Sequence, residues 1–140
     1  MQKRLDSIEI LSYDFPQSGT GISLQPNQAF RQPETKNEGV IIPDIIAFKD
    51  GIGLISENKP YFEKQDIDKL EKIRDGIYSE SLNKVFRDRQ INKLVLGIVL
   101  PNILTEISKA QDYFVRIDFV FVINAIGSCD VEYLLEGITL

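Results

Sequence analysis

The chain of 140 residues contains no histidine and no tryptophan, and only one cysteine and one methionine. Without histidine it can form no His-ligated zinc site, no Ser-His-Asp triad and no histidine general base. The single Cys129 excludes a disulfide within the chain and favours a reducing compartment, so we expect a cytoplasmic protein. The longest apolar runs, 94–100 and 119–123, are too short to cross a bilayer. Residues 1–10 lack the apolar core of a secretory signal, and we expect no membrane association.

The composition is ordinary for a soluble globular protein, with 43% hydrophobic and 26% charged residues. The length predicts a single domain over residues 1–140. A net charge of −5 argues against a general nucleic-acid binder. The charge is uneven, however, because residues 59–93 carry nine basic and seven acidic side chains while both flanking parts are acidic. Positive charge is therefore concentrated in one segment.

Residues 39–59 predict a β-hairpin. The apolar runs 40–42 and 45–48 are rich in β-branched residues and read as one strand. Asp50-Gly51 follows as a strong turn signal, and residues 52–56 read as the return strand. If 46–48 pair with 52–54, the two strands leave the open end of the hairpin near residues 44 and 57.

Two acids interrupt these apolar strands at that open end, Asp44 in the first and Glu57 at the end of the second. Lys59 lies two residues after Glu57, so on a strand both side chains point to the same side. Two carboxylates supply half of a Mg²⁺ shell, and a bound cation activates water and neutralises phosphoryl charge. The alternative is a set of solvated charges at strand ends, but Asp44 is flanked by isoleucines, where an unpaired acid is costly.

Pro43-Asp44 followed after a strand-length gap by Glu57-Asn58-Lys59 resembles the PD-(D/E)xK signature of the restriction-endonuclease-like nuclease superfamily. The resemblance implies that Asp44 and Glu57 bind a divalent metal, with the carbonyl of Asn58 nearby. It also implies that Lys59 assists the nucleophilic water. The motif covers about twenty residues, and the order of expected elements extends the resemblance more loosely over most of the chain. Some branches of that superfamily carry a fuller glutamine-tyrosine motif, which this chain lacks.

Residues 1–13 are ambiguous, although Leu5, Ile8 and Leu11 would share one face of a helix. The resembling family often places a further acid on such a helix facing the metal, and Glu9 is the candidate. The alternative is a solvated helix acid.

Residues 15–38 form a long polar loop by composition. Its Ser18–Gly21 stretch has no Walker lysine, so we expect no nucleotide cofactor. Gln28 and Arg31 are residue types that can read base edges and are candidate DNA contacts. A solvated arm or a protein contact is the alternative for this loop.

A helix is predicted over about 64–87, with an apolar stripe that includes Ile67, Leu70 and Ile73 and with Gly76 as a place where it can break. Basic side chains cover its other faces, and we expect most of them to form short-range ion pairs with neighbouring acids. Lys64 and Lys69, near the hairpin end, are candidate phosphate contacts. Gln65 is a further candidate for the site.

Residues 93–100 predict a central strand buried on both faces, followed by a helix over 103–113 and a strand over 115–125. Residues 131–135 predict a last strand or helix. The order of elements predicts an α/β fold, a mixed central sheet flanked by helices on both faces. This agrees with the αβββαβ core of the restriction-endonuclease-like fold.

The function expected from these residues is Mg²⁺-dependent endonuclease activity on DNA phosphodiesters, with Mn²⁺ as a substitute metal. One site cuts one strand, so cleavage of a duplex requires a homodimer. A restriction endonuclease fits best. A Holliday-junction resolvase and a non-catalytic nucleic-acid- or protein-binding module on the same fold are the alternatives.

Overall fold

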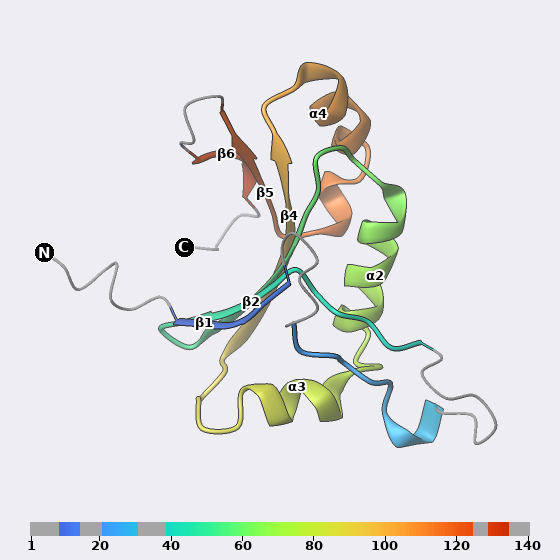
Figure 1. Cartoon of the computed structure of the whole chain (residues 1–140), viewed down its shortest axis with the longest axis vertical. Helices are drawn as coiled ribbons and strands as arrows, with labels where there is room; N and C mark the ends of the chain where they lie inside the picture. The colour runs from blue at the N-terminus through green and yellow to red at the C-terminus, as the bar shows by residue number, and fades with distance from the viewer. Residues whose placement is uncertain (1–8, 15–20, 31–38, 125–128, 135–140) are drawn as a thin grey trace, which may run out of the picture.

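The computed structural model describes residues 9–14, 21–30, 39–124 and 129–134. In these residues the chain forms one six-stranded mixed sheet, in the order β1-β2-β3-β4-β5-β6, with three α-helices beside it (Figure 1). The expected α/β class with a mixed sheet is confirmed. The elements are β1 (Glu9–Tyr13), β2 (Ile45–Lys49), β3 (Ile52–Asn58), α2 (Lys64–Arg74), α3 (Ser79–Val85), β4 (Lys93–Pro101), α4 (Leu104–Gln111), β5 (Phe119–Ile123) and β6 (Cys129–Leu134).

The predicted hairpin is formed by β2 and β3, which pair antiparallel. Asp50 and Gly51 both have positive φ, 49° and 83°, as a two-residue type I′ turn requires. The register pairs Phe48 with Gly53, one residue away from the pairing that we expected from the sequence. β2 begins only at Ile45, because Pro43 has no N–H for a sheet ladder.

Strand β1 pairs antiparallel with β2, whereas β3, β4 and β5 run parallel in chain order and β6 returns antiparallel. The described part of residues 1–13 is therefore a strand and not the helix that was considered. The last element is also a strand. Parallel neighbours need crossover connections, and the chain supplies them through α2 with α3 and then through α4.

The predicted long helix is broken in two at Gly76, as the sequence indicated. Gly76 has φ +89°, a left-handed conformation that other residues adopt only with strain. The described part of the polar loop, residues 21–30, is held at this break. The side-chain amide of Asn27 donates to the carbonyl of Gly76 at 3.0 Å, and its oxygen accepts the backbone N–H of Glu80 at 2.9 Å. The fully buried Leu24 anchors the same loop in the core.

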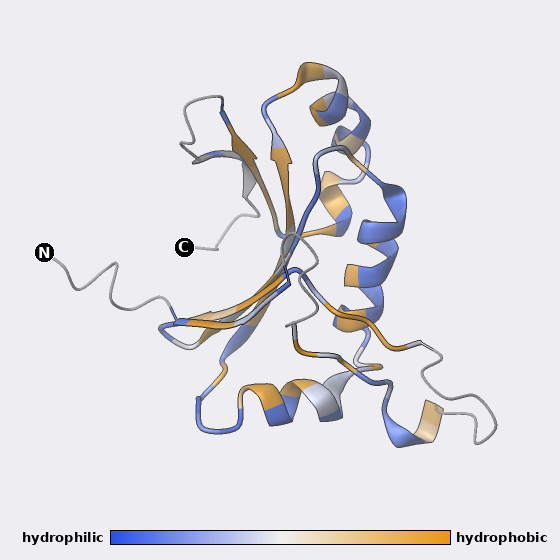
Figure 2. Ribbon diagram, viewed as in Figure 1, coloured by the Kyte–Doolittle hydropathy of each residue, from blue (hydrophilic) through white to orange (hydrophobic). Residues whose placement is uncertain are grey.

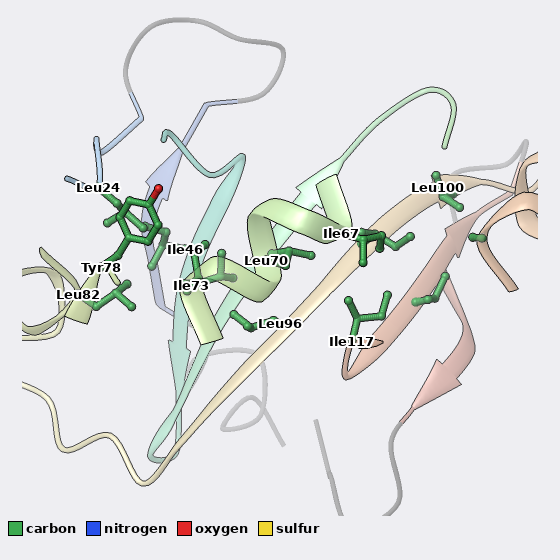
Figure 3. Close-up of a cluster of buried hydrophobic side chains, with 14 of the residues drawn as sticks. Leu24, Ile46, Ile67, Leu70, Ile73, Tyr78, Leu82, Leu96, Leu100 and Ile117 are labelled. Carbon is green, nitrogen blue, oxygen red and sulfur yellow. The ribbon is translucent and has the colours of Figure 1, made fainter. Parts of the chain in front are cut away.

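All three helices pack on one face of the sheet, which corrects the expectation of helices on both faces. Ile67 of α2, Leu82 of α3 and Ala110 of α4 belong to one buried cluster with the strand residues Ile46 and Leu96 (Figure 3). The reason is topological. Successive parallel strands in chain order, joined by right-handed crossovers, place both crossovers on the same side.

The opposite face of the sheet carries a smaller apolar cluster around Val95 and Phe119, both fully buried. Figure 2 shows the hydrophobic colouring of β4 and β5 in the centre of the sheet. Gly97 is required beside this cluster, since a Cβ there would lie 2.4 Å from both Cγ and the backbone oxygen of Phe119. The burial of β4 from both sides, expected from its unbroken apolar run, is confirmed.

Strand β5 starts at Phe119, four residues later than the sequence predicted. The preceding residues Phe114–Arg116 form a short 3₁₀ turn. Arg116 explains the turn, because its guanidinium bonds Glu71 on α2 and donates to Asp68 at 2.8 Å. The side chain of Asp118 then contacts the sheet, because its Oδ2 accepts a hydrogen bond from the backbone N–H of Leu96 at 2.9 Å. No helix among the described residues has the length and apolar character needed to cross a membrane.

Candidate functional site

Asp44 and Glu57 lie together at the open end of the β2–β3 hairpin, as the sequence predicted. The register that pairs Ile45 with Ser56 places Asp44 directly opposite Glu57. The backbone N–H of Asp44 donates to Oε2 of Glu57 at 2.8 Å, and the N–H of Asn58 donates to Oδ2 of Asp44 at 2.7 Å. The two side chains are only 5% and 1% exposed. Each acid is thus oriented by the backbone of the other strand.

Lys69 of α2 forms an ion pair with the second oxygen, Oε1, of Glu57. The sequence predicted a phosphate contact for this lysine. In the structure its ammonium instead contacts the carboxylate of Glu57. The neighbouring Leu70 is buried in the core, which holds this turn of α2 against the sheet and brings the Lys69 side chain to Glu57. Both oxygens of Glu57 therefore have hydrogen-bond donors.

The electrostatics of this pair follow from its burial. Burial raises the pKa of Glu57 above its usual value, against the charge and hydrogen bond of Lys69, which lower it. Burial alone would lower the pKa of Lys69, but the charge and hydrogen bond of Glu57 outweigh it and raise the Lys69 pKa. The half-buried lysine therefore stays protonated as the counter-charge of the buried Glu57.

Asp66 joins the same cluster from the first turn of α2, which the sequence reasoning missed by treating it as a solvated acid. It is 5% exposed. Burial first, and then the nearby charge of Glu57, raises the pKa of Asp66 to about 6, while Lys59 and Lys69 oppose the shift. The spacing could have revealed it. Asp66, Leu70 and Ile73 follow the i, i+4, i+7 pattern of a buried helix stripe.

Lys59 follows the last residue of β3 and is half-buried. Its backbone N–H donates to the carbonyl of Val99 at 3.2 Å, which continues the parallel pairing by one residue. Its charge is close enough to oppose the raised pKa of Asp66. The predicted trio of Asp44, Glu57 and Lys59 is therefore gathered at one end of the sheet.

Glu9 is not part of this cluster. It lies on a strand, not on a helix, and pairs with Phe48 beside the hairpin turn, at the other end of β2 from Asp44. Its carboxylate accepts a hydrogen bond from Nε of Arg89 at 2.8 Å. The acid that the N-terminal segment brings to the site end is Asp14, a buried residue whose N–H donates to the carbonyl of Asp44 at 2.8 Å.

The remaining candidate residues lie around α2. Lys64 is exposed and pairs with Asp68 at 3.4 Å, and Gln65 is exposed on the first turn. Gln28 is also exposed, but its backbone N–H donates to Glu80 of α3 at 3.1 Å, beyond the opposite end of α2 from Glu57. Arg31 lies outside the described residues.

Across the described ranges, no three acidic or cysteine side chains are grouped so as to hold a metal ion. The cluster instead combines the paired carboxylates of Asp44 and Glu57 with Asp66 and two lysines. Chemically it offers hard oxygen ligands, the half-buried counter-charge of Lys69 and the further ammonium group of Lys59 at the strand end.

Fold and cluster together define an α/β protein with buried acids at one end of the inner strands of a mixed sheet. No protein-family model matches the chain, and no curated protein or solved structure gives a significant match to it.

Proposed function

We propose that this chain is a Mg²⁺-dependent endonuclease that hydrolyses DNA phosphodiester bonds. The observation that carries the proposal is the direct juxtaposition of two nearly fully buried acids, Asp44 and Glu57, at the end of one hairpin. Lys59 follows two residues later. Acids are rarely buried this deeply unless a partner or a cation compensates them.

The residues present have the type of ligand atom, carboxylate and carbonyl oxygen, that a magnesium ion prefers. Mg²⁺ is commonly held by one or two carboxylates, with waters and substrate phosphate oxygens completing its shell. Asp44 and Glu57 would supply those carboxylates, and the carbonyl of Asn58 a third oxygen. When bound, the ion would lower the pKa of a water and neutralise charge on the phosphoryl group.

The protein's own groups have separate tasks in this proposal. Lys59 orients the attacking water or contacts the phosphate from the strand end. Lys69 holds the Glu57 carboxylate in place from α2 and keeps the buried charge balanced. The Asp44 carboxylate is fixed by the N–H of Asn58. Both acids are thus oriented before any substrate arrives.

The order of elements supports the same proposal. Three antiparallel strands, a helical crossover and a strand parallel to the third follow one another from β1 to β4. A βββαβ order is what the sequence resemblance implies for the core, and it supports the proposal. A single site cuts one strand, so we propose that the protein acts on duplex DNA as a homodimer.

A restriction-type endonuclease fits the charge of −5 better than a junction resolvase, because a resolvase grips its substrate mainly through phosphates. Lys64, exposed on the first turn of α2, remains a proposed phosphate contact near the site, whereas the ammonium of Lys69 is engaged by Glu57.

One observation favours a second function, a non-catalytic binding module on the same fold. Both oxygens of Glu57 already accept hydrogen bonds, from Lys69 and from the N–H of Asp44. A metal would have to share the carboxylate with Lys69. If the ion pair is permanent, the cluster is a structural link between β3 and α2.

The test is cleavage of plasmid and branched DNA with Mg²⁺ or Mn²⁺ by the wild type and two variants, Glu57→Gln and Lys59→Ala. We expect each variant to cut at least about a hundredfold more slowly, as when a positioned catalytic group is removed. Lys72→Ala, an exposed lysine on α2, is the matched control and should cut at the wild-type rate. Calorimetric titration of the wild type and of Asp44→Ala with Mg²⁺ separates the two functions. A metal site predicts binding that Asp44→Ala abolishes, whereas a structural ion pair predicts no such binding.

A further inference from the structure

A cavity of about 660 Å³ opens at the carboxyl ends of the parallel strands β3, β4 and β5. Its walls are mainly apolar and include Val99, Pro101, Ile103 and Ile123. The register explains the arrangement. Pro101 pairs with Ile123 on neighbouring strands, so both side chains face the same side of the sheet.

The polar groups of the cavity come from the segment that carries the acids. Asn58 and Lys59 line it, and Asn102 and Asn124 contribute further amides from the ends of β4 and β5. Alternation along β3 sends Glu57 and Lys59 to the helix-covered side and Asn58 to the cavity face, so Lys59 borders the cavity from the side that carries the acids. The cavity is therefore separated from Asp44 and Glu57 only by the width of the strand end.

This lining defines the chemistry of a ligand. A pocket of this volume is within the range of small-molecule sites, and apolar walls with a few polar groups are typical of them. Carboxamides both donate and accept hydrogen bonds, and the ammonium of Lys59 attracts an anion. The Oδ1 of Asn58 already accepts a hydrogen bond from Ser56, and the amide of Asn124 donates to Asp130 at 2.8 Å, so the amide nitrogen of Asn58 and the amide of Asn102 are the groups offered to a ligand. An aliphatic chain makes no hydrogen bond to these groups, whereas a planar base has acceptors and donors on its edge and an attached phosphate can lie at Lys59.

We propose that this cavity binds the unstacked base of a nucleotide whose phosphate lies at Lys59, beside Asp44 and Glu57. The proposal rests on the proposed nuclease function and specifies its substrate as a strand with an unpaired or extruded nucleotide next to the scissile phosphate. Unstacked bases are bound in this way, between apolar side chains and with hydrogen bonds to their edges. The half-exposed Tyr61, next to the cavity residue Pro60, offers a neighbouring ring for stacking.

The test is a titration of the full chain with deoxynucleoside 5′-monophosphates, followed by NMR shifts of the backbone amides. Deoxyribose 5-phosphate, which lacks a base, is the matched ligand. We expect the nucleotides to bind at least tenfold more tightly than the base-free phosphate, with the largest shifts at Val99, Ile103 and Ile123.

Two variants fill the cavity, Ile123→Trp and Ile103→Trp, at side chains that are 44% and 47% exposed and so tolerate enlargement. Each should remove the preference for the base and leave binding of deoxyribose 5-phosphate unchanged. Val115→Trp, at a side chain that is 84% exposed and outside the cavity lining, is the control and should bind as the wild type does. Circular dichroism establishes that each variant is folded.

Equal binding of nucleotide and base-free phosphate by the wild type would overturn the proposal, as would a base preference that survives in both folded tryptophan variants. The nuclease proposal fails separately. Metal-dependent cleavage without cavity-dependent nucleotide binding would remove the base pocket and keep the hydrolase. Cavity-dependent binding by a chain that cuts no DNA would remove the hydrolase and keep a nucleotide-binding module.

Discussion

Glu57 is the most constrained charged residue of the cluster, because it is 1% exposed and, among the described residues, its carboxylate pairs with one cation, Lys69. Replacing that lysine leaves a buried charge without compensation, which is far more costly than losing an exposed ion pair. The same carboxylate would gain from a metal ion. The balance between Lys69 and a cation at Glu57 therefore decides which of the two proposed functions holds.

We predict that Lys69→Met lowers the free energy of unfolding at pH 7.5 by about 3 kcal/mol, the usual cost of breaking a buried pair. The loss should shrink toward pH 4, since Glu57, whose pKa is already raised by burial, then takes up a proton. Urea unfolding of the wild type and the variant at pH 7.5 and pH 4 measures both the loss and its decrease. Lys64→Met, which removes an exposed pair with Asp68, is the control and should cost at most about 0.5 kcal/mol. Equal losses in the two variants would contradict the prediction.

Asp66 gives a second prediction at the residue scale. Its pKa in the folded protein is raised from 3.8 to about 6 by burial and by Glu57. A raised carboxyl pKa means that its stabilising contribution is complete below pH 3.8 and is lost as the pH rises through 6.

Asp66→Asn removes this titration. At pH 7.5 the variant should therefore be more stable than the wild type, by up to about 3 kcal/mol for a shift of about two pKa units. The difference should disappear toward pH 4, where the wild-type side chain is protonated. Chemical denaturation across this pH range measures the difference. Asp112→Asn, at an exposed acid at the C-cap of α4, is the control and should change the free energy of unfolding at pH 7.5 by at most about 0.5 kcal/mol. A constant difference at all pH values would refute the assignment.

At the scale of elements, two glycines are required for different physical reasons. Gly76 separates α2 from α3 through a positive φ, and a Cβ there would meet no atom within 4 Å. Gly97 has no such backbone constraint but is pressed against Phe119, including its backbone oxygen. One site is limited by conformation and the other by space.

We expect Gly76→Ala to cost about 1 kcal/mol of unfolding free energy, the strain of a left-handed alanine. Gly97→Ala should cost about 3 kcal/mol, because a backbone atom cannot move aside as a side chain can. Urea unfolding of both variants provides the comparison. Gly76→Asn is the control, since asparagine tolerates this conformation better than alanine does. A Gly97→Ala variant as stable as the wild type would show that the strands can separate at this point.

At the scale of the whole molecule, the one-sided cover of the sheet sets the distribution of stability. The three helices protect one face, and the central strands β3, β4 and β5 are paired on both edges. β1 and β6 lie at the two ends of the strand order and are paired on one edge only. Local opening is cheapest where the fewest backbone groups are held.

We therefore predict that amide hydrogens of β4 exchange most slowly and those of β1 and β6 fastest among the strands. Hydrogen exchange followed by mass spectrometry measures this order. The exposed helix α3 supplies an internal reference, because its amides are hydrogen-bonded but near the surface. Protection of β1 equal to that of β4 would contradict the inferred architecture.

The sequence by itself determined the local features, since each depends on neighbouring residues. The Asp50-Gly51 turn brought Asp44 to Glu57, the apolar run 93–100 made the central strand, and Gly76 broke the helix. The tertiary structure alone decided what depends on distant segments. It moved Glu9 away from the site, buried Asp66, turned Lys69 onto Glu57 and placed all helices on one face. These outcomes depend on strand order and on the packing of α2, which no local pattern encodes.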